Sequence, residues 1–163
     1  MSTPSPSIRP LRPTDEPFLW EMLYEALFVP PGAAPFPREI LRQPEINRYV
    51  AGWGRPTDSG FIVENEQQAM GAVWIRLLTG NDKGYGYVDE ETPELTIALL
   101  PEFRGRGIGE KLMTQMLSHA LNHHAAVCLS VSPDNPALRL YQKLGFETVK
   151  EEGASLTMVR KFV

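Results

Sequence analysis

Residues 94–113 read ELTIALLPEFRGRGIGEKLM, and the change of pattern within them decides the fold. The apolar residues at 95–100 are compatible with a β-strand, and Pro101 ends it, because proline has no N–H for a ladder. Further on, apolar residues recur at the spacing of a helix with one buried face. They are Ile108, Leu112, Met113, Met116, Leu117, Ala120 and Leu121. The stretch therefore predicts a strand, a glycine-rich turn and a helix.

The turn at residues 104–109 has the composition of an anion site. Gly105, Gly107 and Gly109 let the backbone approach a ligand closely and expose several N–H groups. These groups open a helix, where the macrodipole favours an anion. Arg104 and Arg106 add positive charge and fork-shaped donors. This combination indicates a pyrophosphate ligand.

Two widespread phosphate-binding signatures do not fit this turn. A P-loop requires Gly-x4-Gly-Lys-Ser/Thr, but counting from Gly105 the second glycine position is Glu110. The dinucleotide fingerprint requires Gly-x-Gly-x-x-Gly, and here the third glycine comes one residue early. The pattern that does match is Arg-x-x-Gly-x-Gly, formed by Arg104, Gly107 and Gly109.

A second motif follows the next predicted strand, at residues 125–132. Asn135 and Pro136 predict the start of a short helix and Gly145 predicts its end. Residues 135–146 contain Asn-x-Ala-x-x-x-Tyr-x-x-x-Gly-Phe. Together and in this order, the two motifs resemble those of the GCN5-related N-acetyltransferase (GNAT) superfamily.

The resemblance implies an α/β (α+β) fold with a mixed, mostly antiparallel central sheet and about four flanking helices. The sheet is expected to splay into a V between two parallel strands at 94–100 and 126–132, parallel by the right-handed crossover rule. We expect a single N-acetyltransferase domain over 1–163, with a disordered tail at 1–7. Other predicted elements are strands at 8–12, 60–64, 69–78 (with a bulge at Gly71), 146–149 and 154–162, and helices at 14–27 and 38–49, the latter broken near Pro44.

The resemblance also implies that acetyl-CoA is the acyl-donor co-substrate and lies in the cleft of the V. Its pantetheine arm would pair with the backbone of residues 98–100, and its pyrophosphate would lie on the turn. The implied contacts are Ala98, Leu99, Leu100, Arg104, Gly105, Arg106, Gly107, Ile108, Gly109, Glu110, Asn135, Ala137 and Tyr141.

Direct acetyl transfer to an amine needs a base, a donor to the oxyanion and an acid for the leaving thiolate. The resemblance implies the backbone N–H of Leu100 as the oxyanion donor and Tyr141 as the acid. We predict Glu94 as the base, because it starts the strand that carries the coenzyme site. The alternatives are a packing role for Tyr141 and a solvated strand-end carboxylate for Glu94, with Glu91, Glu90 or water as the base.

The composition limits the class of protein. With 163 residues, 42% hydrophobic and 22% charged, the chain reads as soluble and globular. It has no apolar run near the roughly 18 residues of a membrane span, and no apolar signal core. Its single cysteine, Cys128, is compatible with a cytoplasmic protein. The net charge of −4 argues against nucleic-acid binding. His119 and His123 are four residues apart but have no third ligand nearby, so we expect no metal.

The expected function is acetyl-CoA-dependent transfer of an acetyl group to a primary amine of a small molecule or peptide. Two alternatives stay open: a catalytically silent acyl-CoA-binding sensor, and an acyltransferase acting on protein N-termini or lysines. The acceptor site would be shaped by residues 29–56 and 79–92, which carry no diagnostic motif. A homodimer is indicated by the resemblance alone.

Overall fold

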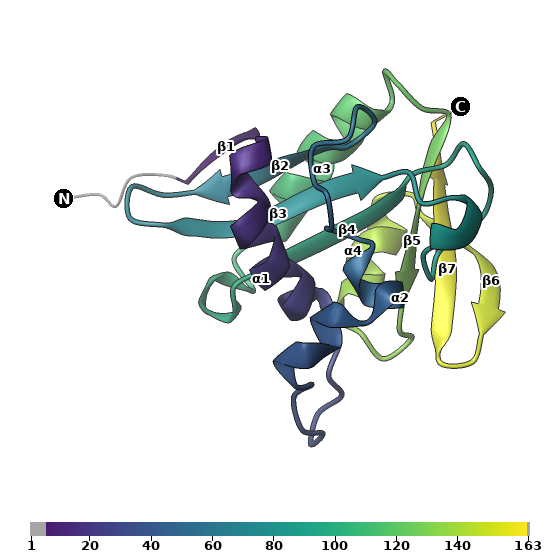
Figure 1. The fold of residues 1–163 in the computed structure, drawn as a ribbon, viewed down its shortest axis with the longest axis horizontal. Coiled ribbons are helices and arrows are strands. Elements are labelled where there is room, and N and C mark those ends of the chain that lie inside the picture. Colours follow the sequence, from purple (N-terminus) through teal and green to yellow (C-terminus); the bar gives the residue numbers. More distant parts are fainter. Residues whose placement is uncertain (1–5, 163) are drawn as a thin grey trace.

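The computed structural model describes residues 6–162 (Figure 1). Within this range, seven strands form one sheet in the order β1-β2-β3-β4-β5-β7-β6. The strands are β1 (Ser7–Pro10), β2 (Ser59–Glu64), β3 (Ala69–Arg76), β4 (Glu94–Leu99), β5 (Ala126–Val131), β6 (Glu147–Glu152) and β7 (Ser155–Lys161). The α-helices are α1 (Glu16–Ala26), α2 (Pro44–Asn47), α3 (Ile108–Ala120) and α4 (Ala137–Lys143).

The helices cover the two faces of the sheet, with α1 and α2 on one side and α3 and α4 on the other (Figure 1). Successive side chains of a strand point to opposite faces. Val73 and Ile75 of β3 therefore pack in the cluster under α3, whereas Ala72 and Trp74 pack under α1. The apolar stripe predicted for α3 is buried at every position within the helix. Leu121 is 52% exposed, because the helix ends one residue before it.

The predicted V between two parallel strands is confirmed. Strand β4 pairs with β3 over six residue pairs, and β5 pairs with β7 over six. Between β4 and β5 the only pair in the described sheet is Glu94 with Cys128. Two antiparallel half-sheets are therefore joined at one point and diverge beyond it, as in the predicted fold class.

Other predictions need correction. Residues 38–49 form only a 3-10 turn (Arg38–Arg42) and the single turn α2, because Pro44 has no N–H to continue a helix. The β2–β3 bulge falls at Met70 rather than Gly71. Gly71 is required for close packing, since a Cβ there would lie 2.2 Å from Leu99 Cδ2. Ser7, predicted in the tail, pairs with Glu64 in the sheet; residues 1–5 of that tail lie outside the described residues.

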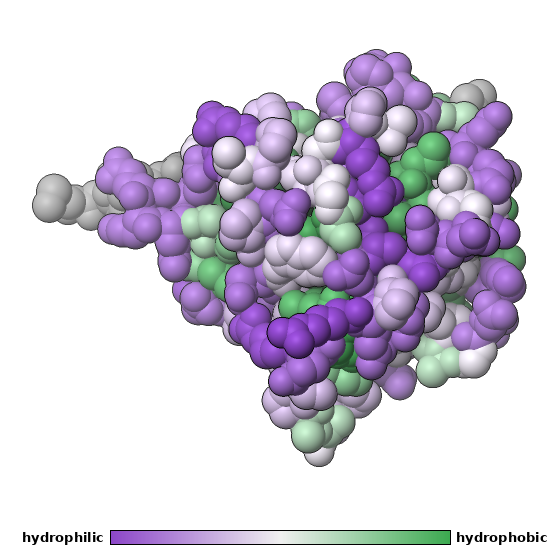
Figure 2. All heavy atoms as spheres, in the orientation of Figure 1, coloured by the Kyte–Doolittle hydropathy of each residue, from purple (hydrophilic) through white to green (hydrophobic). Residues whose placement is uncertain are grey.

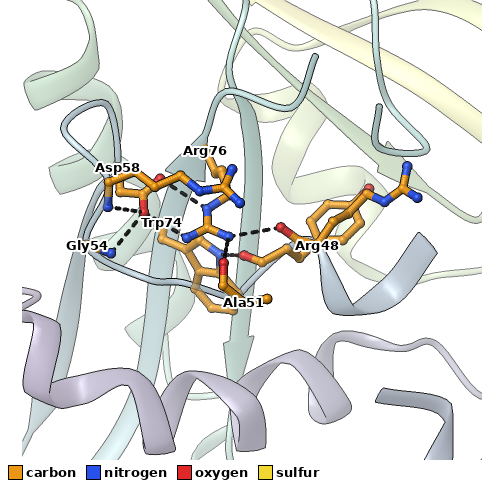
Figure 3. A network of polar contacts seen from close by, with 8 residues as sticks. Arg48, Ala51, Gly54, Asp58, Trp74 and Arg76 are labelled. Carbon is orange, nitrogen blue, oxygen red and sulfur yellow. Dashed lines mark hydrogen bonds and ion pairs between the residues drawn. The ribbon is translucent and has the colours of Figure 1, made fainter. Parts of the chain in front are cut away.

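A buried ion pair ties the segment 48–58 to the end of β3 (Figure 3). The guanidinium of Arg76 donates to both oxygens of Asp58, at 3.0 and 2.8 Å, and both side chains are 1% exposed. It also donates to the carbonyl oxygens of Arg48 (3.0 Å) and Ala51 (2.6 Å). Every polar atom of this pair has a hydrogen-bond partner, so the two charges can be buried without a large energetic cost. The pair holds the segment 48–58 beside the sheet.

We predict that Asp58→Ala lowers the free energy of unfolding by about 3–5 kcal/mol, because it leaves the Arg76 guanidinium buried without a counter-ion. Urea unfolding measures the change. Glu21→Ala is the matched control: Glu21 pairs with Arg38 at 3.0 Å, but both side chains are about half exposed, so the loss should stay within about 1 kcal/mol. Equal losses in the two variants would contradict this account of the network.

Candidate active site

A cleft of about 1250 Å³ opens where β4 and β5 diverge. Its lining includes the turn at 104–110, β4, the end of β5 and α4. It also includes the end of α1, parts of the loop at 27–36, and Ile46, Tyr49 and Tyr85. The splay therefore brings the strand–turn–helix stretch and the Asn135 motif to the same cavity, together with Glu94.

The backbone of β4 presents alternate residues to the cleft. The N–H of Leu100 donates to the Met70 carbonyl of the neighbouring chain segment at 2.9 Å, so the polar groups of Leu100 and Ala98 face β3. The Pro93 carbonyl accepts from Cys128 on the opposite side, at 3.0 Å. The backbone groups of Ile97 and Leu99 therefore face the cleft, beyond the single β4–β5 pair.

This alternation corrects one predicted role. The Leu100 N–H is already committed to the sheet, so it is not available to stabilise an oxyanion in the cleft. Leu99 is the neighbour of Leu100 along β4, and because the direction of the backbone groups alternates, its N–H faces the cleft side. A shift of one residue along a strand reverses the direction of its polar groups, and this shift could not be fixed from the sequence.

The glycine-rich turn leads directly into α3, with Gly107 at the N-terminal cap in the left-handed region (φ 80°). Arg104, Gly105, Gly107, Gly109 and Glu110 line the cleft. The Arg104 side chain donates to the Leu99 carbonyl (3.2 Å) and to Glu25 on α1 (3.0 Å). This leaves the N–H groups of its Nη1 for a ligand.

Two residues of the turn have side chains outside the cleft lining. Arg106 lies with its guanidinium carbon 5.9 Å from the centre of the Phe103 ring. Ile108 is 7% exposed and packs in the core under α3. Only the backbone of these two residues remains for the predicted coenzyme contacts.

The Asn135 motif forms the opposite wall. Asn135 Oδ1 accepts from the Ala137 N–H at 2.9 Å. Ala137 is the first residue of α4, so this bond caps the start of the helix. Asn135, Ala137 and Tyr141 all line the cleft. Burial raises the pKa of Tyr141 to about 12. Its hydroxyl makes no hydrogen bond within residues 6–162. In that range no fully buried side-chain N or O atom lacks a hydrogen-bond partner, so the Tyr141 hydroxyl is accessible from the cleft.

Glu94 lies at the junction of the two half-sheets and is only 4% exposed. One carboxylate oxygen accepts from the Tyr49 hydroxyl and the other from the Gly86 N–H, at 3.1 Å. Burial raises the pKa of Glu94 to about 7, and the hydrogen bonds from Tyr49 and Gly86 oppose this rise. The carboxyl is therefore not a solvated strand-end group, which was the alternative interpretation.

Tyr49 and the segment 84–86 lie in the two ranges predicted to shape the acceptor site, but their contacts with Glu94 were not predicted. The Tyr49 hydroxyl accepts from the Tyr85 N–H at 2.8 Å, and the Tyr49 carbonyl accepts from Trp74 Nε1 at 3.0 Å. A Cβ on Gly84 would lie 2.3 Å from a Glu94 oxygen, and one on Gly86 would lie 2.7 Å from the β5 backbone. The alternating glycines of Gly84-Tyr85-Gly86 were the available signal, because they permit this close approach.

Three further observations concern metal ligands, helix length and the cysteine. Within residues 6–162, no group of three or more His, Cys, Asp or Glu side chains is placed to hold a metal ion. Of the helices in that range, none is long and apolar enough to cross a membrane. Cys128 is fully buried, and burial raises the pKa of its thiol.

Comparison with known proteins identifies the family. The Acetyltransferase (GNAT) family profile matches residues 19–146, most of the chain. The chain therefore belongs to the GNAT family, in agreement with the resemblance of its two motifs.

Particular relatives differ in their named substrates. The chain is 36% identical over 118 residues to a mycothiol acetyltransferase of Corynebacterium glutamicum (strain R), covering 64% of this chain and 40% of that protein. It is 28% identical over 113 residues to an L-2,4-diaminobutyric acid acetyltransferase of Nocardia farcinica, covering 60% and 58%. The chain thus spans only about half the length of these curated relatives.

Solved structures share the fold. The PaiA N-acetyltransferase from Thermoplasma acidophilum, in complex with coenzyme A, matches with a TM-score of 0.68 at 17% identity over 98% of this chain and 100% of that one. The ribosomal-protein-S18-alanine N-acetyltransferase of Escherichia coli matches with a TM-score of 0.64 at 17% identity, over 96% and 94%.

The burial of Glu94 predicts a pH-dependent cost to stability. The folded protein holds the carboxyl proton up to a pKa of about 7, against an ordinary value of 4.5 in the unfolded chain. The contribution of protonated Glu94 to the free energy of unfolding is therefore complete below pH 4.5 and is lost as the pH rises through 7. We expect the stability of the wild type to fall over this window relative to Glu94→Gln, by about 1.4 kcal/mol per pH unit at most.

Urea unfolding of both proteins between pH 4 and pH 8 measures this difference. Glu91→Gln provides the control, because it makes the same substitution at an exposed loop position. A difference between wild type and Glu94→Gln that stays constant with pH would show that the Glu94 carboxyl titrates like one in water.

Proposed function

We propose that this chain is an acetyl-CoA-dependent N-acetyltransferase that moves the acetyl group directly to a primary amine of a small molecule or peptide. One observation carries the proposal. The unpaired backbone edge of β4, the N-terminus of α3 and the buried carboxylate of Glu94 all line the same cleft. A thioester laid along β4 would thus lie between an anion site and a base.

The coenzyme site is proposed from the backbone of β4 and of the turn. The pantetheine arm would add to β4 like a short strand and bond to the backbone of Ile97 and Leu99. The pyrophosphate would lie on the N–H groups at residues 104–110, where the α3 dipole favours it. The coenzyme A present in the similar structure of PaiA supports this use of the fold.

Glu94 is proposed as the base that takes a proton from the acceptor ammonium, directly or through one water molecule. A base is most effective when its pKa lies near the working pH, and the pKa of Glu94 is about 7. Tyr49 is proposed as a positioning residue. It holds one carboxylate oxygen while its own hydroxyl accepts from the Tyr85 N–H, which fixes its direction.

The remaining steps use the cleft-facing groups of β4 and α4. The Leu99 N–H would donate to the carbonyl oxygen as charge develops on it, in place of Leu100. Tyr141 keeps its proton at neutral pH, because burial raises its pKa to about 12, so it can donate to the departing thiolate. The buried carboxyl at the reacting end of the cleft favours an enzyme over a catalytically silent sensor.

We predict that Gly107→Asp abolishes acetyl-CoA binding. It places an anion at the proposed phosphate site and a side chain at a left-handed residue (φ 80°). Gly153→Asp is the matched control, since Gly153 is also left-handed (φ 60°) and equally open, but lies in the β6–β7 turn. Calorimetry should show binding in the wild type and in the control only. Unimpaired binding by Gly107→Asp would refute the site.

We predict that Glu94→Gln lowers kcat/KM by about 10²–10⁴-fold. In the wild type kcat/KM should rise with pH up to about 7, because only the ionised carboxyl accepts a proton, and this limb should disappear in the variant. Tyr49→Phe should move the limb to higher pH, because it removes a hydrogen bond that lowers the pKa of Glu94. Thiol release with one amine across the pH range tests both. A limb that persists in Glu94→Gln would remove Glu94 from the mechanism.

A further inference from the structure

Four of the five charged side chains that line the cleft in the described chain form ion pairs with each other, and one does not. Five lining side chains carry charge within the described chain. Arg104 pairs with Glu25 at 3.0 Å, and Lys143 pairs with Glu110 at 2.5 Å. Glu94 is the fifth, and no Lys, Arg or His of residues 6–162 forms an ion pair with it. Within the described chain, the lining therefore has one carboxylate without an ion-pair partner, whereas each of its two cations already pairs with a carboxylate.

We propose that the acceptor is a hydrophobic monoamine: a primary amine with one positive charge, an apolar or aromatic body, no carboxylate and no second ammonium. This inference rests on the proposed function and specifies its substrate class.

The polar end of such an acceptor fits Glu94. An ionised carboxylate has about four acceptor positions, and the Tyr49 hydroxyl and the Gly86 N–H occupy two of them. The positions that remain can receive the N–H groups of one ammonium.

The apolar end fits the rest of the wall. Leu27, Phe28, Phe36, Ile46 and Tyr85 line the same cleft as Glu94. Phe36 is 39% exposed and Tyr85 is 56% exposed, and the two residues lie on separate loops. Two of the four large exposed hydrophobic residues in the described chain thus face this one cavity. Figure 2 shows patches of hydrophobic surface in this part of the molecule, with polar residues around them.

This wall should reject other amines by desolvation and repulsion. A second ammonium would lose its water among these apolar side chains without gaining a counter-ion. A carboxylate next to the amine would be repelled by the Glu94 carboxylate, and both cations of the lining already pair with a carboxylate. The class excluded in this way includes linear diamines and free amino acids.

Matched pairs of amines test each element of the proposal by thiol release from acetyl-CoA. 2-Phenylethylamine and L-phenylalanine differ by a carboxylate, and L-phenylalaninamide removes that charge again. Butylamine and 1,4-diaminobutane differ by a second ammonium. We expect kcat/KM for phenylethylamine to exceed that for phenylalanine by about 100-fold or more, with recovery in the amide, and butylamine to exceed diaminobutane by about tenfold.

Two substitutions test whether Phe36 and Tyr85 contact the apolar part of the acceptor. In Phe36→Ala the backbone stays anchored, because the Phe36 carbonyl, not its ring, accepts from the Tyr24 hydroxyl. This variant and Tyr85→Ala should each reduce the preference for phenylethylamine over butylamine by about three- to tenfold. Val149→Ala removes an exposed apolar side chain of β6 outside the cleft, and it should leave the ratio unchanged.

The outcomes separate this inference from the proposed function. A higher kcat/KM for phenylalanine than for phenylethylamine, or for diaminobutane than for butylamine, would overturn the monoamine class and leave the acetyltransferase standing. Binding of acetyl-CoA without thiol release from any of these amines would also overturn the class. Absence of acetyl-CoA binding would overturn the proposed function itself.

Discussion

The single pair between Glu94 and Cys128 is the constraint on which the site depends. If β4 and β5 paired along their whole length, their backbone groups would satisfy each other and no cleft would exist. Because they diverge, the backbone of Ile97 and Leu99 lacks a partner strand, and a ligand that brings amide groups can supply one. The two half-sheets remain in place through their own ladders and the helices on each face.

The same junction explains the buried carboxyl. Glu94 is the residue of β4 at the point of divergence, so its side chain enters a space enclosed by the sheet, Tyr49 and the strip 84–86. A buried carboxylate is costly unless it is bonded, and within residues 6–162 two donors bond Glu94. Arg76 and Asp58 solve the corresponding problem by pairing with each other. This contrast supports the proposal that Glu94 meets the cationic acceptor.

The sequence predicted the fold class and the identity of the motif residues, because both depend on local patterns. The alternation of β4, the glycine turn and the stripe of α3 each encode one element and its direction. What it did not predict depends on contacts between distant segments. Tyr49 reaches Glu94 across 45 residues, and it lies in the turn after α2, a helix of four residues with no periodicity to detect. The choice of Leu99 over Leu100 depends on the register with β3, which no local pattern contains.

The alternation of β4 also separates the two substrates of the proposed reaction. The side chains of Leu95, Ile97 and Leu99 pack toward α3, while Ala98 packs on the α1 face and Glu94 meets Tyr49 there. The backbone groups that would hold the thioester point along the sheet into the cleft, between these two faces. One strand can therefore hold the donor with its backbone and meet the acceptor with a side chain. Substitutions in the loops at 27–36 and 84–86 can then change the acceptor without disturbing the backbone that holds the coenzyme.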